Sequence, residues 1–115
     1  MITCEKLEKH YGKRVILTDV SFQIDEPKII GLIGRNGVGK STLLKIIAGH
    51  AKASNGNIEV FGKKPFQNLT VAANTIFIED GMTFPAVLTL REIFKSAEKF
   101  YINFATDLAF ELLKF

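Results

Sequence analysis

Cysteine, histidine and long apolar runs are scarce in this sequence of 115 residues. The single cysteine, Cys4, excludes an internal disulfide and offers no cysteine cluster for zinc. The two histidines, His10 and His50, have no partner at metal-ligand or catalytic spacing. No apolar run approaches the ~20 residues that a membrane-spanning helix needs. Disulfide scaffolds, zinc modules and helical membrane spans are therefore excluded for these residues.

A strong excess of one charge is also missing. The net charge is +3, and the lysines are spread along the chain, so the pattern gives no footprint of nucleic-acid binding. With 47% hydrophobic and 23% charged residues, the composition is typical of a globular chain and not of a disordered one. One domain is expected for this length, and it is long enough to bury a core.

The strongest local signal is a glycine-rich stretch, GLIGRNGVGKSTLL, at residues 31–44. Gly34, four free positions and Gly39-Lys40-Ser41 match the pattern G-x-x-x-x-G-K-[ST], in which backbone N–H groups converge on phosphate oxygens. A side chain at either glycine would crowd those groups. Lys40 would reach the terminal phosphates, and the Ser41 hydroxyl would ligate Mg²⁺. The alternative is a glycine-rich turn without a ligand.

The segments on both sides of this stretch have the order that a phosphate loop requires. Residues 28–33 form a short apolar run typical of a buried parallel strand. After the loop, apolar residues recur at helical spacing up to Ile47, and Gly49 stands where a helix cap is expected. The start of that helix would direct its partial positive charge at the same anion.

The remaining segments predict a mixed α/β protein. Residues 2–9 alternate weakly, and residues 15–25 place Val20, Phe22 and Ile24 on one face, so both are expected to be strands. The further expected elements are a hairpin-type turn at residues 54–57, strands at 58–61 and 75–78, and a helix over 89–115 that Thr89 caps with Glu92 as its capping-box partner.

Four stretches stand together in an order found in one protein family. They are YGKRVILTDVSFQID, IIGLIGRNGVGKSTLLKIIAG, SNGNIEVFGK and LTLREIF, and they span nearly the whole chain. In these stretches the sequence resembles the ATP-binding subunits of ABC transporters. The phosphate loop alone would indicate any P-loop NTPase, whereas RNGVGKSTLLKIIAG followed by GNIEVFGK is much narrower.

The resemblance implies a fold and an internal organisation. The fold class is α/β, with a P-loop NTPase core of the ABC type and an antiparallel β-subdomain. The implied parts are a β-subdomain mainly from residues 1–27 and 54–64, the P-loop strand and helix at 28–50, a strand at 75–80, and the start of a helical subdomain at 89–115.

The resemblance also implies which residues bind ATP and Mg²⁺. Tyr11 matches the aromatic residue that stacks on adenine, and the alternative is a turn tyrosine with its ring on the sheet. Glu79 takes a strand-end place where the family usually has Gln, beside Mg²⁺ and the attacking water, and the alternative is a solvated loop carboxylate. The implied phosphate-binding residues are Gly34, Asn36, Gly37, Gly39, Lys40, Ser41 and Thr42, with Ser41 also a ligand of Mg²⁺.

The sequence departs from the family pattern in several places. Pro27 replaces the usual Gly of its turn and Arg35 the usual Pro of the loop, and neither change removes a phosphate contact. The LSGGQ-like signature, the Walker B strand with its catalytic Glu and the switch His have no counterpart in these residues. We therefore expect the N-terminal half of such a domain, truncated before the signature and Walker B regions.

The resemblance further implies partners and a location. The partners are a transmembrane permease subunit and a second nucleotide-binding domain, and the place is the cytoplasmic face of the cell membrane. The complete form hydrolyses ATP to drive transport, whereas this chain is expected to bind nucleotide without turnover. The aromatic residues Phe94, Phe100, Tyr101 and Phe104 are expected to pack in a core, and the alternative is a groove for the permease.

Three alternatives stay open at this point. The chain could be a compact P-loop NTPase that uses Asp80, in the string IFIED, as its Walker B carboxylate. It could be a non-catalytic fragment that holds nucleotide or pairs with a partner. It could also fail to fold alone, because uncovered sheet edges and apolar faces favour aggregation. The order FP…LT.RE after IFIED favours the ABC interpretation over the compact enzyme.

Overall fold

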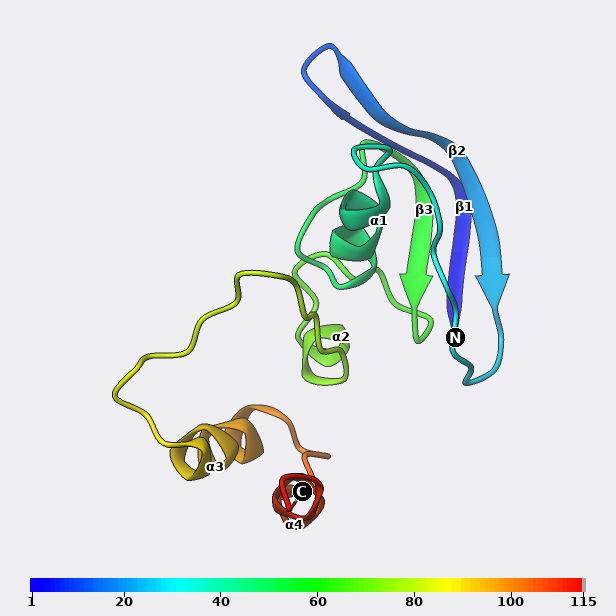
Figure 1. Ribbon diagram of the computed structural model, residues 1–115. Helices are drawn as coiled ribbons and strands as arrows, with labels where there is room; N and C mark the ends of the chain where they lie inside the picture. Colours follow the sequence, from blue (N-terminus) through cyan, green and yellow to red (C-terminus); the bar gives the residue numbers. More distant parts are fainter. Residues whose placement is uncertain (115) are drawn as a thin grey trace. The chain divides into compact units, whose positions relative to one another are not determined.

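The computed structural model describes residues 1–114, and the chain divides into two compact units, Met1–Phe77 and Ile78–Phe115. The first unit contains strands β1 (Ile2–Tyr11), β2 (Arg14–Ile24) and β3 (Asn55–Val60) and helices α1 (Lys40–Ile47) and α2 (Leu69–Ala73) (Figure 1). The second contains helices α3 (Leu90–Phe100) and α4 (Thr106–Leu112). The combination of helices with an antiparallel sheet confirms the expected α/β class.

The three strands form one antiparallel sheet in the order β2-β1-β3. Gly12 and Lys13 make the tight turn between β1 and β2, and Gly12 has a φ of 57°, which glycine adopts without a Cβ clash. The turn places Tyr11 opposite Arg14. Pairing of β1 with β3 ends at Glu8, whereas pairing with β2 continues to Tyr11. The tip of the β1–β2 hairpin is therefore a two-stranded ribbon that extends beyond β3.

A β-bulge in the central strand explains why a glycine lies in the next strand. Between Glu5 and Glu8, β1 has one residue more than the segment of β3 that it pairs with, and Lys6 adopts a φ of 46°. A Cβ on Gly56 would lie only 2.2 Å from the carbonyl oxygen of Lys6. The hairpin-type turn predicted at residues 54–57 is therefore wrong. Gly56 lies at the start of β3, where it makes room for the bulge of β1.

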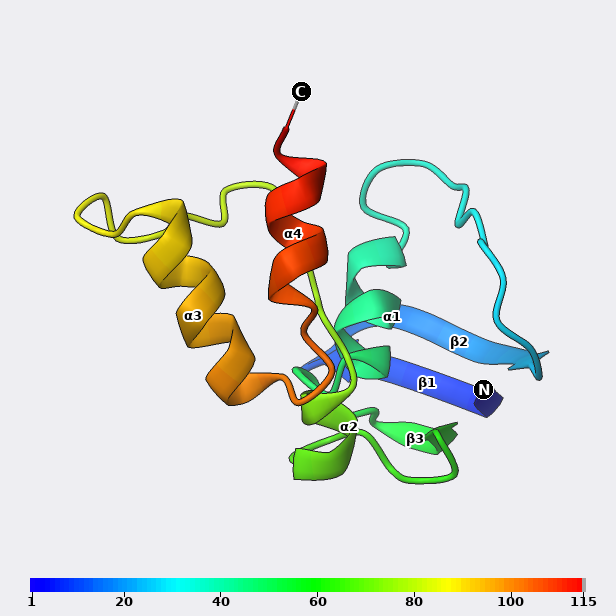
Figure 2. The same cartoon turned by 90° about the horizontal axis from the view of Figure 1, so that it is seen from below.

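Helix α1 lies across one face of this sheet and completes a small core (Figure 1, Figure 2). The bulge resets the alternation of β1, so that Cys4 and Leu7 are both buried. Leu43 and Ile46 from α1 lie on one helix face and join them. Full burial of such an aliphatic side chain stabilises the fold by about 1.5–3 kcal/mol. The buried cluster comprises Cys4, Leu7, Leu17, Leu43, Ile46 and Ile58.

The strands predicted at residues 28–33 and 75–78 are not formed, and both segments are irregular. A strand needs a neighbour that completes its hydrogen-bond ladder, and no strand within residues 1–114 pairs with either segment. The side chains of Ile29 and Ile33 are consequently fully exposed. The apolar run before the phosphate loop thus has the composition of a buried strand without the pairing of one.

The single helix predicted over residues 89–115 is divided in the structure, and Phe115 lies outside the described residues. Helix α3 ends at Phe100, and Tyr101 takes an extended conformation with φ −121° and ψ 102°. The residues that follow include Ile102 and Asn103, which are weaker helix formers than the alanine, leucine and lysine of a typical helix interior. Local preference therefore supports the break between α3 and α4.

The predicted start of that helix is confirmed. The Thr89 hydroxyl accepts a hydrogen bond from the Glu92 N–H at 3.3 Å, and the Glu92 carboxylate accepts one from the Thr89 N–H at 2.8 Å. The Thr89 hydroxyl also donates to the Glu92 carboxylate at 2.8 Å. The bond from the Thr89 backbone, followed by the bond from its hydroxyl, holds the pKa of Glu92 below its usual value. The capping box thus favours the ionised carboxylate.

Aromatic contacts join the two helices of the second unit. The Phe94 ring lies 5.8 Å from that of Phe104 and 5.0 Å from that of Phe110, measured between centroids, and the second pair meets edge to face. Phe94 and Phe104 thus contact each other, but both are half-buried, and neither α3 nor α4 contains a buried residue that would make the expected core. The expected packing role is wrong for Phe100, which ends α3 with its side chain 75% exposed.

The reactivity of the Cys4 thiol tests whether the first unit is folded in the isolated chain. Cys4 is 2% exposed, its Sγ donates to the Val20 carbonyl oxygen at 3.3 Å, and burial, followed by the charge of Glu5, raises its thiol pKa. We expect the thiol to react with a disulfide reagent at pH 8 roughly 100-fold more slowly in buffer than in denaturant, as an opening free energy near 3 kcal/mol would give. Equal rates would show that the sheet and α1 do not assemble in the isolated chain.

Candidate functional site

The glycines of the phosphate loop adopt conformations that other residues rarely take. Gly37 has a φ of 82° and Gly39 a φ of 106°. Gly39 also lies against β2: a Cβ there would be 2.8 Å from Leu17 Cδ2 and 3.0 Å from the carbonyl oxygen of Ile16. Both the backbone dihedral and the available space therefore require glycine at position 39.

Helix α1 begins at the loop with its backbone donors uncapped. Gly39 is the N-cap, no side chain caps the helix, and its first turn holds no acidic residue. The first intrahelical bond runs from the Leu43 N–H to the Gly39 carbonyl oxygen at 2.9 Å. The N–H groups of residues 40–42 have no acceptor within the helix and carry the positive end of its dipole. This arrangement suits an anion.

The Lys40 ammonium is held inside the loop. Its Nζ donates to the carbonyl oxygen of Gly34 at 2.5 Å and to that of Arg35 at 2.7 Å. An ammonium has three hydrogens, so one remains for an additional acceptor. The contact also gives Gly34 a place in the site, because its carbonyl group positions the lysine.

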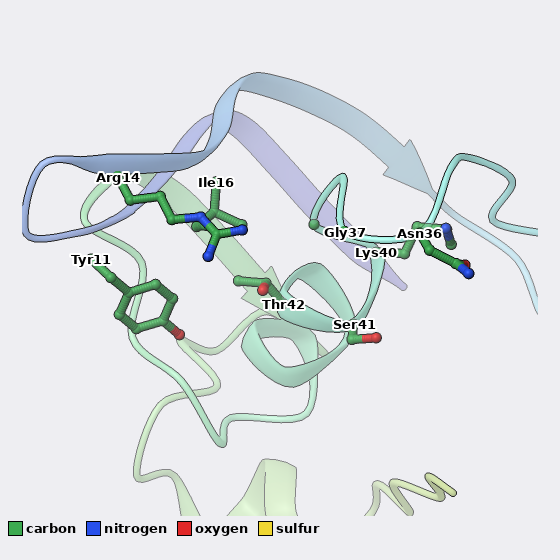
Figure 3. Close-up of a pocket in the computed structure, with 9 residues that line it drawn as sticks. Tyr11, Arg14, Ile16, Asn36, Gly37, Lys40, Ser41 and Thr42 are labelled. Atoms are coloured by element: carbon green, nitrogen blue, oxygen red, sulfur yellow. The ribbon is translucent and has the colours of Figure 1, made fainter.

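A hollow of about 690 Å³ lies between the hairpin tip and the loop (Figure 3). Tyr11, Arg14 and Ile16 line it from the hairpin, and the loop with the start of α1 lines it from the other side. The structure therefore brings together, around one cavity, residues that are far apart in the sequence. The predicted site residues that line it are Tyr11, Asn36, Gly37, Gly39, Lys40, Ser41 and Thr42.

The Tyr11 ring is accessible on the hairpin tip. Its side chain is 56% exposed, and the Lys9 Nζ lies 4.4 Å from the ring centroid, a cation–π contact on one face. The same ammonium donates to the Lys52 carbonyl oxygen at 2.8 Å, and the His10 N–H donates to Ser54 Oγ at 3.1 Å. These bonds tie the ribbon to the chain before β3, so the ring is held at the rim of the hollow with one face free of Lys9.

Glu79 and Asp80 belong to the second unit, whereas the phosphate loop belongs to the first. Both are exposed, and Glu79 opens a turn in which the Met82 N–H lies 3.4 Å from its carbonyl oxygen. The predicted metal contact of Glu79 stays a prediction. Within residues 1–114 no cluster of His, Cys, Asp and Glu could hold a metal ion by itself. The Ser41 hydroxyl, which lines the hollow, is an oxygen ligand of the kind that Mg²⁺ prefers.

Two residues that line the hollow, Arg14 and Ile16, were missed by sequence reasoning. The signal for Arg14 was present, since a two-residue turn at Gly12 and Lys13 places it opposite Tyr11. Ile16 could not have been found in this way. An irregularity in the pairing of β2, where His10 pairs with Val15 but Lys9 with Leu17, changes the register at that residue.

Comparison with known proteins agrees on one family. The family model described as ABC transporter matches residues 17–102. The manganese transport system ATP-binding protein MntB of Bacillus subtilis is 49% identical over 53 residues, which are 46% of this chain and 21% of that protein. The lantibiotic transport ATP-binding protein SrtF of Streptococcus pyogenes is 42% identical over 64 residues, which are 56% of this chain and 28% of that protein.

A solved structure gives the same result for the fold. The structure of an ATP-binding subunit of an ABC transporter superposes with a TM-score of 0.79 at 29% identity, and the match covers 88% of this chain and 42% of that one. The chain thus matches less than half the length of each of these relatives. No helix in the described part of the chain has the length and apolar character of a membrane span. By its sequence and its fold, this chain belongs to the ABC transporter family, and the residues that match the family model include the glycine-rich loop.

Proposed function

We propose that the chain binds Mg²⁺–ATP as the nucleotide-binding part of a transporter's ATP-binding subunit. The observation that carries this proposal is the hollow, which an accessible aromatic ring lines from the hairpin and which Lys40 and the uncapped start of α1 line from the other side. A nucleotide needs these two features at its opposite ends. Stacking holds the base, and converging donors hold the phosphates.

At the phosphate end, the N–H groups of residues 40–42 and of the glycine-rich turn supply donors at fixed positions. The third hydrogen of the Lys40 ammonium reaches a terminal phosphate while its other two stay on the carbonyl groups of Gly34 and Arg35. Ser41 lines the hollow and holds Mg²⁺ through its hydroxyl. When bound, the cation neutralises negative charge on the terminal phosphates.

At the base end, the face of Tyr11 away from Lys9 receives the base. Stacking discriminates poorly among bases, since each base has a π face. The Lys9 ammonium on the opposite face keeps the ring oriented. We infer that this end contributes affinity with little base specificity.

We further propose that the isolated chain does not hydrolyse the nucleotide it binds. Hydrolysis needs an oriented water molecule and donors for the developing charge on the γ-phosphoryl oxygens. Within the first unit of the chain, no carboxylate lines the hollow to orient such a water. In the complete transporter, a longer ATP-binding subunit and a second nucleotide-binding domain would supply these groups. A permease partner would place the assembly at the inner face of the membrane.

Replacement of Lys40 by alanine tests the phosphate end. Loss of a charge-assisted hydrogen bond worth ~1.5–3 kcal/mol should weaken ATP binding by roughly 10- to 150-fold in a calorimetric or fluorescence titration. The matched control is Lys64→Ala, which removes an exposed lysine far along the chain from the loop and should leave the Kd unchanged. Equal affinities of the wild type and Lys40→Ala would remove the loop from the site.

Replacement of Tyr11 tests the base end. Tyr11→Ala should weaken ATP and GTP alike, by the ~1–3 kcal/mol that a stacked base contributes, whereas Tyr11→Phe, which keeps the ring, should bind both as the wild type does. Pyrophosphate lacks a base, so its affinity should stay the same in all three proteins. A loss of pyrophosphate binding as large as the loss of ATP binding would show that Tyr11 supports the fold and not the base.

Phosphate release decides between a binding module and a compact enzyme. We expect the purified chain to bind ATP without release above background, because the groups that orient water are missing from the hollow. The compact-enzyme alternative requires slow release that disappears in both Lys40→Ala and Asp80→Ala. Such a result would overturn the proposal, whereas release that survives Lys40→Ala would indicate a contaminating ATPase.

A further inference from the structure

Arg14 lies in the hollow without an assigned role. It opens β2 directly after the hairpin turn and is the register partner of Tyr11. Residues opposite each other in an antiparallel pair project from the same face of the sheet. Both line the hollow, and Figure 3 shows the Arg14 side chain pointing into it, on the side of Tyr11 and Thr42.

The guanidinium group of Arg14 has no partner in the described part of the chain. No carboxylate of residues 1–114 forms an ion pair with it, and no side-chain hydrogen bond or ring contact engages it. The ribbon around it, residues 9–14, contains Lys9 and Lys13 but no acidic residue. Five donors in a planar fork are thus available to an anion, and this geometry matches a phosphate group.

The position of Arg14 relative to the other site residues indicates which phosphate it would bind. Tyr11, at the base end, is its cross-strand neighbour, whereas Lys40 and Ser41, at the terminal-phosphate end, lie across the hollow on the loop and α1. The part of a nucleotide adjacent to the base comprises the ribose and the α-phosphate, and only the α-phosphate is anionic. Resting on the nucleotide binding proposed above, we propose that Arg14 binds the α-phosphate.

This contact gives Arg14 a different ligand dependence from the other site residues. ATP and ADP both carry an α-phosphate, which the ribose joins to the base, and both would use Arg14. Adenosine has the base and ribose alone, and pyrophosphate occupies the terminal positions alone. Neither would use Arg14. The residue thus joins the two ends of the site and selects ligands that contain both.

The test is a titration of ATP, ADP, adenosine and pyrophosphate into the wild type, Arg14→Gln, Arg14→Lys and Lys13→Gln. Arg14→Gln should weaken ATP and ADP by about tenfold, the lower end for a hydrogen bond to a charged group, because the side chain is exposed. Arg14→Lys keeps the charge without the fork and should lie between the wild type and Arg14→Gln. Adenosine and pyrophosphate should bind unchanged.

Lys13→Gln is the matched control, since it removes the same charge from the adjacent turn residue, which does not line the hollow. It should bind all four ligands as the wild type does. An equal loss in Lys13→Gln and Arg14→Gln would reduce the effect to general electrostatic attraction and overturn the proposal. A loss of adenosine or pyrophosphate binding that matches the loss of ATP binding would also overturn it.

Two further outcomes separate this proposal from the one on which it rests. Unchanged ATP binding in Arg14→Gln, together with weakened binding in Lys40→Ala, would overturn the role of Arg14 and leave nucleotide binding intact. Absence of ATP binding by a wild type whose Cys4 thiol is protected would overturn both. Cys4 protection in each variant shows that the sheet is formed, and Arg14→Lys, the milder change, carries the test if Arg14→Gln unfolds.

Discussion

The close approach of Gly39 to β2 is the contact on which the rest of the site depends. A side chain at this position would meet Leu17 Cδ2 at 2.8 Å and the Ile16 carbonyl oxygen at 3.0 Å, and the φ of 106° would strain any L-residue. Because the helix can lie directly against the strand, its uncapped start and Lys40 line the same hollow as the hairpin tip. A larger residue would separate helix and sheet, and the hollow would lose one wall.

The irregularities of the sheet have a related consequence. Pairing with β3 ends at Glu8, so the last residues of the β1–β2 hairpin form a ribbon that is free to reach over the helix start. Two hydrogen bonds, from the Lys9 ammonium to Lys52 and from the His10 N–H to Ser54, fix this ribbon to the segment before β3. The bulge at Lys6, accommodated by Gly56, keeps Leu7 in the core while the strand continues toward Tyr11. In a regular strand, the side chains of Leu7 and Tyr11 would lie on the opposite face of the sheet.

Binding and hydrolysis make different demands on such a structure. Binding needs fixed donors, a cation and an aromatic face, and a small sheet with one helix can position all of them within one compact unit. Hydrolysis also needs groups that act only as charge moves in the transition state, and these must approach the γ-phosphate from outside the loop. The relatives that carry the words ATP-binding in their names are several times longer than the stretch they share with this chain.

The sequence by itself determined the phosphate loop, the helix that follows it, the capping box at Thr89 and the two N-terminal strands. Each of these depends on local chemistry: glycine dihedrals, helical spacing, a side-chain cap and alternation. It did not determine whether the apolar runs at 28–33 and 75–78 become strands, since a strand exists only when a neighbour completes its ladder. It also misread Asn55-Gly56 as a turn and missed Arg14 and Ile16 in the site. Only the tertiary structure decided these points, because the bulge opposite Gly56 and the hairpin register that faces Arg14 toward the loop are relations between segments distant in the chain.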